Sequence, residues 1–403
     1  MTRLLFALEK FPPEYTGAGL RALKTAGRMS GTHDIRIVCL SQGNLGKDEA
    51  RLSITRLKCP SSEDAKVFAG HIICLMHKAG KYLKRESGKF DTIHFYSFTW
   101  VNRIIMLYNL MFYRKKTILD VTLEGQDDPV SLLRAGLKNR LASPITGFLL
   151  RRLDIIIVSS EPARQSCIKA GIKPDRIRML PHGCDENEFG QIKSSKRPAL
   201  RKKLRIAEGA FVFMNVGKLQ ERKNQLAIVK AFCETAKSSG KRGTKAGRPL
   251  LVLVGPYNEG SKYLERIKSA YEAEGMLGSV MITGKQANVN EYLACADALV
   301  FASGQEGFPN VIVESLMSGT PVITTEQGCL DRYLGRQEGL EVLRTSGLSD
   351  DSKASAIAEA MQRAWLSKKR ANRKSIRTDA IRNFSSRQID ARISEIYSEV
   401  AGK

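Results

Sequence analysis

The chain has 403 residues, 42% of them hydrophobic and 26% charged, and this composition is typical of a packed globular protein and excludes a disordered or fibrous one. Its length is about twice that of a usual single domain, so we expect two hydrophobic cores. The formal net charge of +24 favours anionic ligands of any kind, or simply a solvated basic surface, and does not choose among nucleotide phosphates, lipid headgroups and nucleic acid.

Membrane-spanning, metal and disulfide signals are weak in this sequence. The charge-free runs at 67–77 and 92–102 are about half of the roughly 20 residues that cross a bilayer, so no transmembrane helix is expected. The apolar run Leu4–Leu8 is too short for a signal peptide and is interpreted as a strand, which favours a cytoplasmic protein. The eight cysteines show no CxxC or Cys/His spacing, so we expect reduced thiols and no zinc site.

Short apolar runs bounded by turn residues alternate with helical stretches, a pattern typical of parallel sheets covered by helices on both faces. The predicted strands of the first half are Leu4–Leu8, Ile35–Leu40, Thr92–Phe95, Thr117–Thr122, Ile155–Ser159 and Ile177–Leu180. After a basic stretch at 191–205, the predicted strands of the second half are Phe211–Val216, Leu250–Val254, Val280–Thr283, Ala298–Ala302 and Pro321–Thr325. The fold class is therefore α/β, with a doubly wound sheet in each half.

The chain is expected to form two domains and a terminal helix. We place the N-terminal domain at 1–188 and the C-terminal domain at 189–375. Apolar residues at helix-like intervals favour one helix from Ile376 to Val400. We expect this helix, within 376–403, to pack back on the N-terminal domain.

The segment 302–323 carries the clearest chemistry, because ligands of open sheets bind beyond the carboxyl ends of the strands. It is predicted to form a strand end, a glycine-containing loop, a helix and a further strand. Pro309 suits the first helical position, which needs no N–H donor, and Gly319 suits the left-handed stop. We expect free N–H groups between Gly307 and Val311 to attract an anion such as a diphosphate.

Four charged residues accompany this expected anion site. Glu306 lies on the loop and Glu314 within the helix, so one carboxylate is expected to reach a sugar ring and the other the hydroxyls of a ribose. Lys218 and Lys223 lie on a second loop that follows the first strand of the second half. Because both loops follow strands of one predicted sheet, they are expected to open into the same crevice.

The segment EGFPNVIVESLMSGTPVI, which starts at Glu306, resembles the Glu-x7-Glu motif of retaining glycosyltransferases of the GT-B fold, especially family 4, the group 1 glycosyl transferases. The resemblance implies two Rossmann-like domains that face an interdomain cleft. It makes Lys218 and Lys223 the cations that neutralise the donor diphosphate, although the family more often has arginine at the position of Lys218. It assigns the hydroxyls of the donor sugar to Glu306.

The same resemblance implies further donor contacts. These are Gly17, Gly217, Gly307, Phe308, Pro309, Asn310, Val311 and Glu314. Gly17 belongs to a glycine loop after the first strand, where a missing Cβ permits close approach to a phosphate. Many family members place a histidine near the donor sugar; residues 119–129 contain none, and Glu124 is the nearest candidate for a donor or acceptor contact. His94 and His182 also follow family patterns, and we interpret them as packing residues.

The activity implied by the resemblance is a retaining hexosyl transfer that needs no metal and no cofactor. The donor is a UDP- or GDP-linked sugar, and the acceptor is a saccharide or a lipid-linked saccharide. Such a reaction serves the synthesis of cell-surface polysaccharides or glycoconjugates. We expect the enzyme in the cytoplasm, either free or peripheral on the inner membrane face.

Other interpretations stay open at this point. The chain could be an inactive relative that only binds sugar nucleotides, or a sugar-nucleotide epimerase on the same fold. The basic stretches lack the interleaved aromatic residues that stack bases, so no nucleic-acid partner is predicted. The segment 104–116, which is apolar and then basic, together with Arg151–Arg152, fits either an anionic membrane surface or a buried helix with a charged end.

Overall fold

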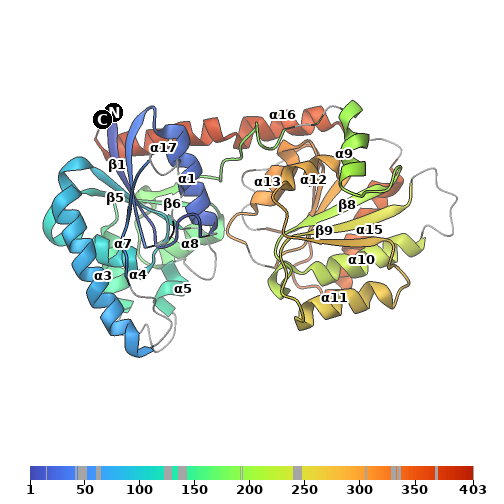
Figure 1. Cartoon of the computed structure of the whole chain (residues 1–403), viewed down its shortest axis with the longest axis horizontal. Helices are drawn as coiled ribbons and strands as arrows, with labels where there is room; N and C mark the ends of the chain where they lie inside the picture. The colour runs from blue at the N-terminus through green and yellow to red at the C-terminus, as the bar shows by residue number, and fades with distance from the viewer. Residues whose placement is uncertain are drawn as a thin grey trace. The chain divides into compact units, whose positions relative to one another are not determined.

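The computed structural model divides into two compact units (Figure 1). The first unit consists of Met1–Pro181 and Ile389–Lys403, and the second of His182–Gln388. The boundary differs from the one expected after residue 188, because residues 182–188 group with the second unit. The residues described are 1–14, 16–40, 43, 52–59, 65–121, 129–134, 143–190, 192, 194–238, 247–304, 306–327, 333, 337–367 and 371–402.

The first unit contains a parallel sheet with strand order β3-β2-β1-β4-β5-β6-β7. Its strands are β1 (Thr2–Ala7), β2 (His33–Cys39), β3 (Ser53–Arg56), β4 (Thr92–Phe95), β5 (Lys116–Val121), β6 (Ile155–Val158) and β7 (Ile177–Met179). The strand order reverses at β1, which pairs with both β2 and β4, and this confirms the predicted doubly wound sheet. The sequence does not predict β3, because none of its four residues is buried and it therefore lacks an apolar run.

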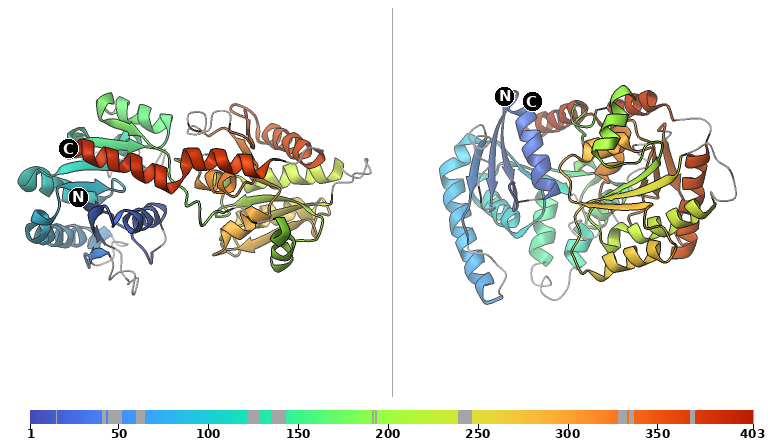
Figure 2. Two further views of the ribbon diagram at one scale, coloured as in Figure 1. Left: turned by 90° about the horizontal axis from the view of Figure 1, so that it is seen from above. Right: turned by 45° about the vertical axis from the view of Figure 1, so that its right-hand side comes forward.

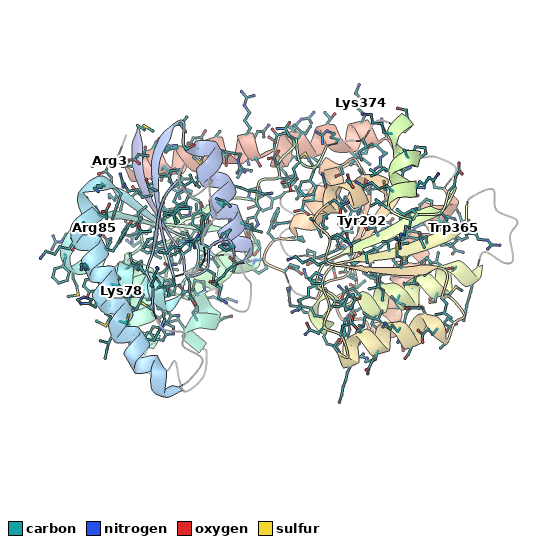
Figure 3. The ribbon with its side chains drawn as sticks, viewed as in Figure 1. Arg3, Lys78, Arg85, Tyr292, Trp365 and Lys374 are labelled. Atoms are coloured by element: carbon teal, nitrogen blue, oxygen red, sulfur yellow. The ribbon has the colours of Figure 1, made fainter. Side chains whose placement is uncertain are left out.

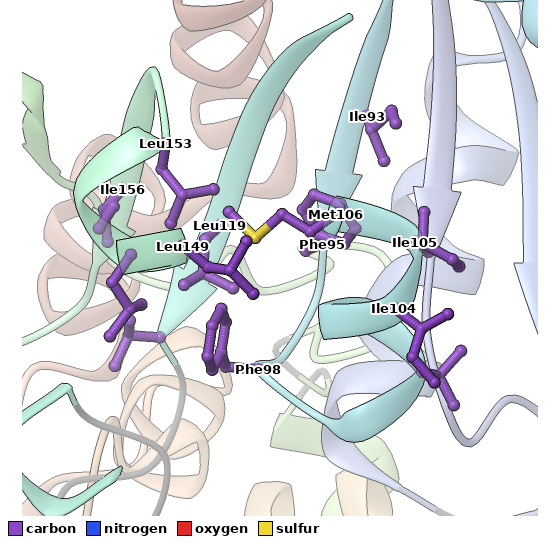
Figure 4. Close-up of a cluster of buried hydrophobic side chains, with 14 of the residues drawn as sticks. Ile93, Phe95, Phe98, Ile104, Ile105, Met106, Leu119, Leu149, Leu153 and Ile156 are labelled. Atoms are coloured by element: carbon purple, nitrogen blue, oxygen red, sulfur yellow. The ribbon is translucent and has the colours of Figure 1, made fainter. Parts of the chain in front are cut away.

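Helices cover both faces of this sheet. Because successive residues of a strand point to opposite faces, each strand contributes side chains to two cores. Leu5 and Ala7 of β1 belong to a core shared with α3, α4, α7 and α8 (Figure 4), whereas Leu4 and Phe6 belong to a core shared with α1 and α17. The helices are α1 (Gly17–Met29), α3 (Ala65–Glu86), α4 (Trp100–Tyr108), α5 (Pro129–Arg134), α7 (Ser143–Arg152), α8 (Glu161–Lys169) and α17 (Ser386–Val400). No helix among the described residues is both long and apolar enough to cross a bilayer.

The end of the chain forms two helices, so the expectation of one helix from Ile376 to Val400 is wrong. The first, α16 (Arg373–Phe384), packs in a core of the second unit, and the second, α17, packs in the first unit through Tyr397. The backbone leaves the helical path at Ser385, because the N–H of Ser386 donates to the carbonyl of Cys184 instead. In the first unit, the hydroxyl of Tyr397 lies 2.8 Å from Nδ1 of the fully buried His94. This contact is consistent with a packing role for the histidine.

The second unit contains a sheet with helices around it (Figure 2). Its strands are parallel and follow the order β10-β9-β8-β11-β12-β13. Its strands are β8 (Phe211–Val216), β9 (Pro249–Val254), β10 (Val280–Gly284), β11 (Ala298–Phe301), β12 (Val322–Thr325) and β13 (Leu340–Leu343). The strand order reverses at β8, which pairs with both β9 and β11. The sequence does not predict β13, whose four residues are all half-exposed.

Two cores flank this second sheet. One involves α10 (Gln225–Ser238), α11 (Lys262–Glu272) and α15 (Asp350–Leu366). The other involves α9 (Arg197–Lys203), α12 (Val289–Cys295), α13 (Asn310–Met317) and α16. The sheet is therefore covered on both faces, and the loops at its edge lie between these two layers of helices.

The start of β11 is held by a mostly buried ion-pair cluster around Asp297. Its carboxylate accepts hydrogen bonds from Arg197 at 2.9 Å, from Arg201 at 2.7 Å and from the backbone N–H of Val212 at 2.8 Å. Burial raises the pKa of this carboxyl group, but the two guanidinium groups and the hydrogen bonds together outweigh burial, so the pKa lies below its usual value. A charged carboxylate therefore ties α9 to the sheet.

We predict that Asp297→Asn destabilises the second unit by about 3 kcal/mol at neutral pH, because Arg197 and Arg201 then lose their anion while mostly buried. In a Trp100→Phe background, Trp365 is the only tryptophan and reports on unfolding of this unit in denaturant. The matched control is Asp351→Asn, whose ion pair with Lys230 is exposed and contributes less than about 1 kcal/mol. Equal losses of stability in the two variants would contradict the stabilising role of the Asp297 cluster.

The stability difference between the parent and Asp297→Asn is expected to change with pH in a defined direction. Because the folded pKa of Asp297 is lowered, its stabilising contribution is complete above the unfolded carboxyl pKa of about 4 and is lost as the pH falls through the folded value. The stability difference between the parent and Asp297→Asn is therefore expected to be constant near neutral pH and to shrink in acid. A difference that grows on acidification would contradict this sign.

Candidate functional site

The candidate site lies where two loops leave adjacent strands of the second sheet. One loop follows β8 and contains Lys218 and Lys223, and the other follows β11 and contains Glu306. The two strands are parallel neighbours at the point where the strand order reverses. Their carboxyl ends therefore deliver both loops to one edge of the sheet, which is the usual ligand-binding position of a doubly wound fold.

The loop after β8 begins with a close approach of two glycines. Gly217 has φ +156° and donates its N–H to the carbonyl of Val254, and Gly255 has φ +152°. A Cβ on Gly255 would lie 2.1 Å from the carbonyl oxygen of Gly217, which is inside contact distance. Glycine at both strand ends therefore sets the path of the loop as it leaves the sheet.

A buried glutamine holds the rest of this loop. Gln225, at the start of α10, donates its side-chain N–H to the carbonyl of Lys218 at 3.0 Å. A 3-10 turn at Glu221–Lys223 follows, and Asn224 closes it with a left-handed φ of +51°. The sequence reasoning does not single out Gln225, because a lone glutamine after a basic loop carries no recognisable signal.

Glu306 accepts hydrogen bonds from both loops on a single oxygen. Its Oε1 lies 2.6 Å from Nζ of Lys223, 2.9 Å from a guanidinium nitrogen of Arg222 and 2.6 Å from the hydroxyl of Ser303. The side chain of Glu306 is only 9% exposed, so solvent screens this charge cluster weakly. The N–H of Gly304 also donates to the carbonyl of Arg222 at 2.9 Å, which ties the backbones of the two loops together.

The structure thus brings together Lys223 and Glu306 from the predicted set, and it adds Arg222. The Nζ of Lys223 also lies 5.4 Å from the ring centroid of Phe301, a cation–π distance. Lys218, by contrast, is exposed, and within the described part of the chain no ion pair joins it to Glu306. In the sequence, the only indication of a role for Arg222 is its position directly before Lys223. The 3-10 turn brings both side chains to the carboxylate of Glu306.

The beginning of α13 differs from its prediction in two ways. Pro309 is the residue before the helix, with φ −81° and ψ 81°, and Asn310 is the first helical residue. The N–H of Asn310 is not free, because it donates to the carbonyl of Phe308 at 3.0 Å. The expectation of free N–H groups throughout Gly307 to Val311 is therefore wrong for Asn310, because the turn at the helix start closes on itself.

His182 is half-buried at this helix start and makes two contacts there. Its Nδ1 lies 2.9 Å from the amide oxygen of Asn310, and its ring lies 4.8 Å from that of Phe308. Phe308 is buried against Phe384, so it gives the half-buried histidine a rigid support. The histidine therefore contacts two residues that the sequence assigned to the donor.

The remaining predicted residues are more dispersed. Glu314 lies half-buried in the second turn of α13, and Val311 packs its side chain toward a core. Gly17 lies in the first unit, where it begins α1 with open space around it. At the neighbouring Gly19, a Cβ would lie 2.8 Å from the carbonyl of Lys10, so Gly19 is the glycine that packing requires. Glu124 lies outside the described residues.

This arrangement concentrates positive charge beside one carboxylate at a sheet edge. Lys223 and Arg222 share Glu306, Lys218 lies on the same loop, and the positive end of the α13 dipole is nearby in sequence. Among the described residues, no three His, Cys, Asp or Glu side chains are grouped in a way that holds a metal ion. The protein groups present are suited to binding a multiply charged anion with hydroxyl groups beside it.

Each half of the chain matches a known family description. The family description "Glycosyl transferases group 1" matches residues 196–380, and "Glycosyl transferase 4-like domain" matches residues 16–183. N-acetyl-alpha-D-glucosaminyl L-malate synthase of Bacillus anthracis is 23% identical over 50% of this chain and 56% of its own length. Alpha-monoglucosyldiacylglycerol synthase of Streptococcus pneumoniae is 30% identical over 44% of this chain and 38% of its own length. The matches thus span about half or less of these relatives.

A solved structure gives the same fold over the whole chain. The Anabaena protein HepE in complex with UDP aligns with a TM-score of 0.75 at 17% identity, covering 99% of this chain and 100% of that one. At this level of identity the likeness shows the fold alone.

The glycine contact at the base of the site leads to a stability prediction. Gly255→Ala is expected to destabilise the second unit by about 3 kcal/mol, because the new Cβ meets the Gly217 carbonyl and the backbone φ is unfavourable for alanine. Denaturant unfolding followed by Trp365 fluorescence in the Trp100→Phe background measures the loss. Gly278→Ala is the control, since its Cβ would enter open space. A loss no greater than the control's would show that the close approach is absent.

Proposed function

The chain belongs to the group 1 glycosyltransferases and has the GT-B fold that the sequence predicted, and on this basis we propose that it transfers a sugar with retention of configuration. The proposed donor is a nucleotide-diphosphate sugar, linked to UDP or GDP. The proposed acceptor is a saccharide or a lipid-linked saccharide. The Anabaena neighbour binds UDP, and the Streptococcus relative is named for a glucosylated lipid, which supports both proposals.

The observation that carries this proposal is the meeting of Lys223 and Arg222 on the single carboxylate of Glu306. Without donor, Glu306 compensates the two cations and holds them in position. We propose that a bound diphosphate takes over part of this pairing, which frees Glu306 to accept hydrogen bonds from hydroxyls of the donor sugar. The cations then already lie where the phosphate charge develops, and such preorganised contacts typically contribute about 3 kcal/mol each to transition-state stabilisation.

The proposed reaction breaks the bond between the anomeric carbon and the donor phosphate oxygen and forms a bond from the acceptor oxygen to the same face of the sugar. The departing diphosphate gains negative charge, which Lys223, Arg222, Lys218 and the start of α13 would stabilise. The acceptor proton passes to an oxygen of the departing diphosphate. Because these groups supply the positive charge, we propose that the transfer does not require a metal ion, and an assay with EDTA tests this.

We predict that Glu306→Gln and Lys223→Gln each lower sugar transfer by about 100-fold or more, because each removes a charge at the reacting centre. UDP- and GDP-sugars are first screened for thermal stabilisation of the purified chain. Transfer is then measured as release of the free nucleoside diphosphate in the presence of candidate acceptors.

The control for both variants is Glu221→Gln. Glu221 belongs to the same 3-10 turn, but its exposed carboxylate pairs with Arg266 at 2.6 Å and is not part of the Glu306 cluster. Its substitution is expected to leave transfer within about twofold of the parent. Parental activity in Glu306→Gln would remove the role proposed for that carboxylate, and failure of every UDP- and GDP-sugar to bind would remove the proposed donor class.

A further inference from the structure

One face of the first unit combines cations with exposed apolar side chains. Glu86, the last residue of α3, is mostly buried and pairs with Arg85 and Lys89 at the end of the helix. Two stretches, 65–85 and 92–119, contain nine lysines and arginines and no aspartate or glutamate. They form α3, α4 and the π-helical turn η2 (Asn109–Tyr113), and α3 packs against α4. Figure 3 shows Lys78 and Arg85 along α3. This charge excess is thus gathered on neighbouring elements, which we call the α3–η2 face.

Several cations of this face are not neutralised by neighbours. Lys81, Lys84 and Arg114 are exposed, and within the described part of the chain none of them forms an ion pair. Lys116, at the border, does pair with Asp154 at 3.3 Å. The α3–η2 face therefore presents positive charge to the solvent and attracts an anionic partner.

Large apolar side chains project beside these cations. Met111 and Phe112 on η2 are 57% and 61% exposed, and Ile73 and Met76 on α3 are 68% and 40% exposed. A surface hollow of about 530 Å³ lies between the two elements and is lined by Lys81, Lys84, Tyr108, Phe112 and Tyr113. Apolar side chains that cluster in this way on a solvent-exposed face commonly mark an interaction surface.

The backbone holds Met111 and Phe112 in a fixed position. The helix α4 continues into η2, and Arg114 ends it with a left-handed φ of +49°. The side chain of Asn109 donates to the carbonyl of Lys115 at 2.8 Å and accepts from its N–H at 2.8 Å, which locks the turn. Gly80 lets Tyr108 approach α3, since a Cβ there would lie 3.1 Å from the tyrosine ring. The exposed pair is therefore presented on a rigid support.

We propose that the α3–η2 face binds the surface of an anionic lipid bilayer. Methionine and phenylalanine enter the boundary between headgroups and acyl chains, and lysine stems lie along it with their ammonium groups at the phosphates. A partner that offered negative charge alone would leave Ile73, Met76, Met111 and Phe112 in water. Both halves of the face match a membrane interface, and this binding does not depend on the proposed sugar transfer.

The structure separates the two interpretations of the segment 104–116. Ile104, Ile105 and Met106 of α4 are buried in the core, as a buried helix requires, whereas Met111 and Phe112 are exposed. Arg152, which the sequence placed with this surface, lies on α7 with its guanidinium 5.0 Å from the ring of Phe148. The proposal therefore rests on α3 and η2 alone.

Sedimentation of the full chain with vesicles tests the proposal. We expect binding to vesicles of phosphatidylcholine with about one third phosphatidylglycerol, and little binding to phosphatidylcholine alone. Raising the salt from about 0.1 M to about 0.5 M is expected to release the protein, because screening shortens the reach of the lysine charges. Lys81→Gln with Lys84→Gln is expected to weaken binding by roughly tenfold or more, and Met111→Ser with Phe112→Ser to weaken it comparably.

The matched control is Lys262→Gln with Lys268→Gln, which removes two exposed lysines from α11 of the second unit and should bind vesicles as the parent does. Circular dichroism checks that each variant is folded. No binding by the parent, or equal binding by the parent and both α3–η2 variants, overturns the proposal. Because no donor is present, this result is independent of whether sugar is transferred.

Discussion

The reversal of strand order at β8 is the constraint on which the site depends. Parallel strands end at one edge of the sheet, and at the reversal the loops after β8 and β11 leave between helices that turn to opposite faces. Lys223 and Glu306 are far apart in sequence, yet this topology leaves their loops as direct neighbours. The hydrogen bond from Gly304 to Arg222 then fixes the distance between the two loops.

Within this frame, a shared carboxylate is the recurring electrostatic device of the second unit. Asp297 precedes β11 and accepts hydrogen bonds from two arginines, and Glu306 follows β11 and accepts hydrogen bonds from an arginine and a lysine. Each carboxylate is mostly buried, so its charge acts at short range with little screening. The first joins a helix to the sheet, and the second holds cations at the edge where a ligand can compete for them.

The net charge of +24 is accordingly distributed in two different ways. In the second unit, cations converge on buried carboxylates and shape a compact site. On α3 and η2 of the first unit, exposed cations such as Lys81 and Lys84 form no ion pair within the described residues, and they lie beside exposed apolar side chains. The same composition thus gives cations paired with buried carboxylates in one unit and exposed cations beside apolar side chains in the other.

The sequence by itself determined the class of the fold, most of the strands and the two loops that carry Lys223 and Glu306, because apolar runs and glycine-bounded turns are local signals. It did not predict β3 or β13, which lack buried residues, or the break at Ser385, which depends on pairing with Cys184. Only the tertiary structure decided that Arg222 reaches Glu306. That choice is made by the 3-10 turn and the pairing of distant strands, and no short stretch of sequence contains both.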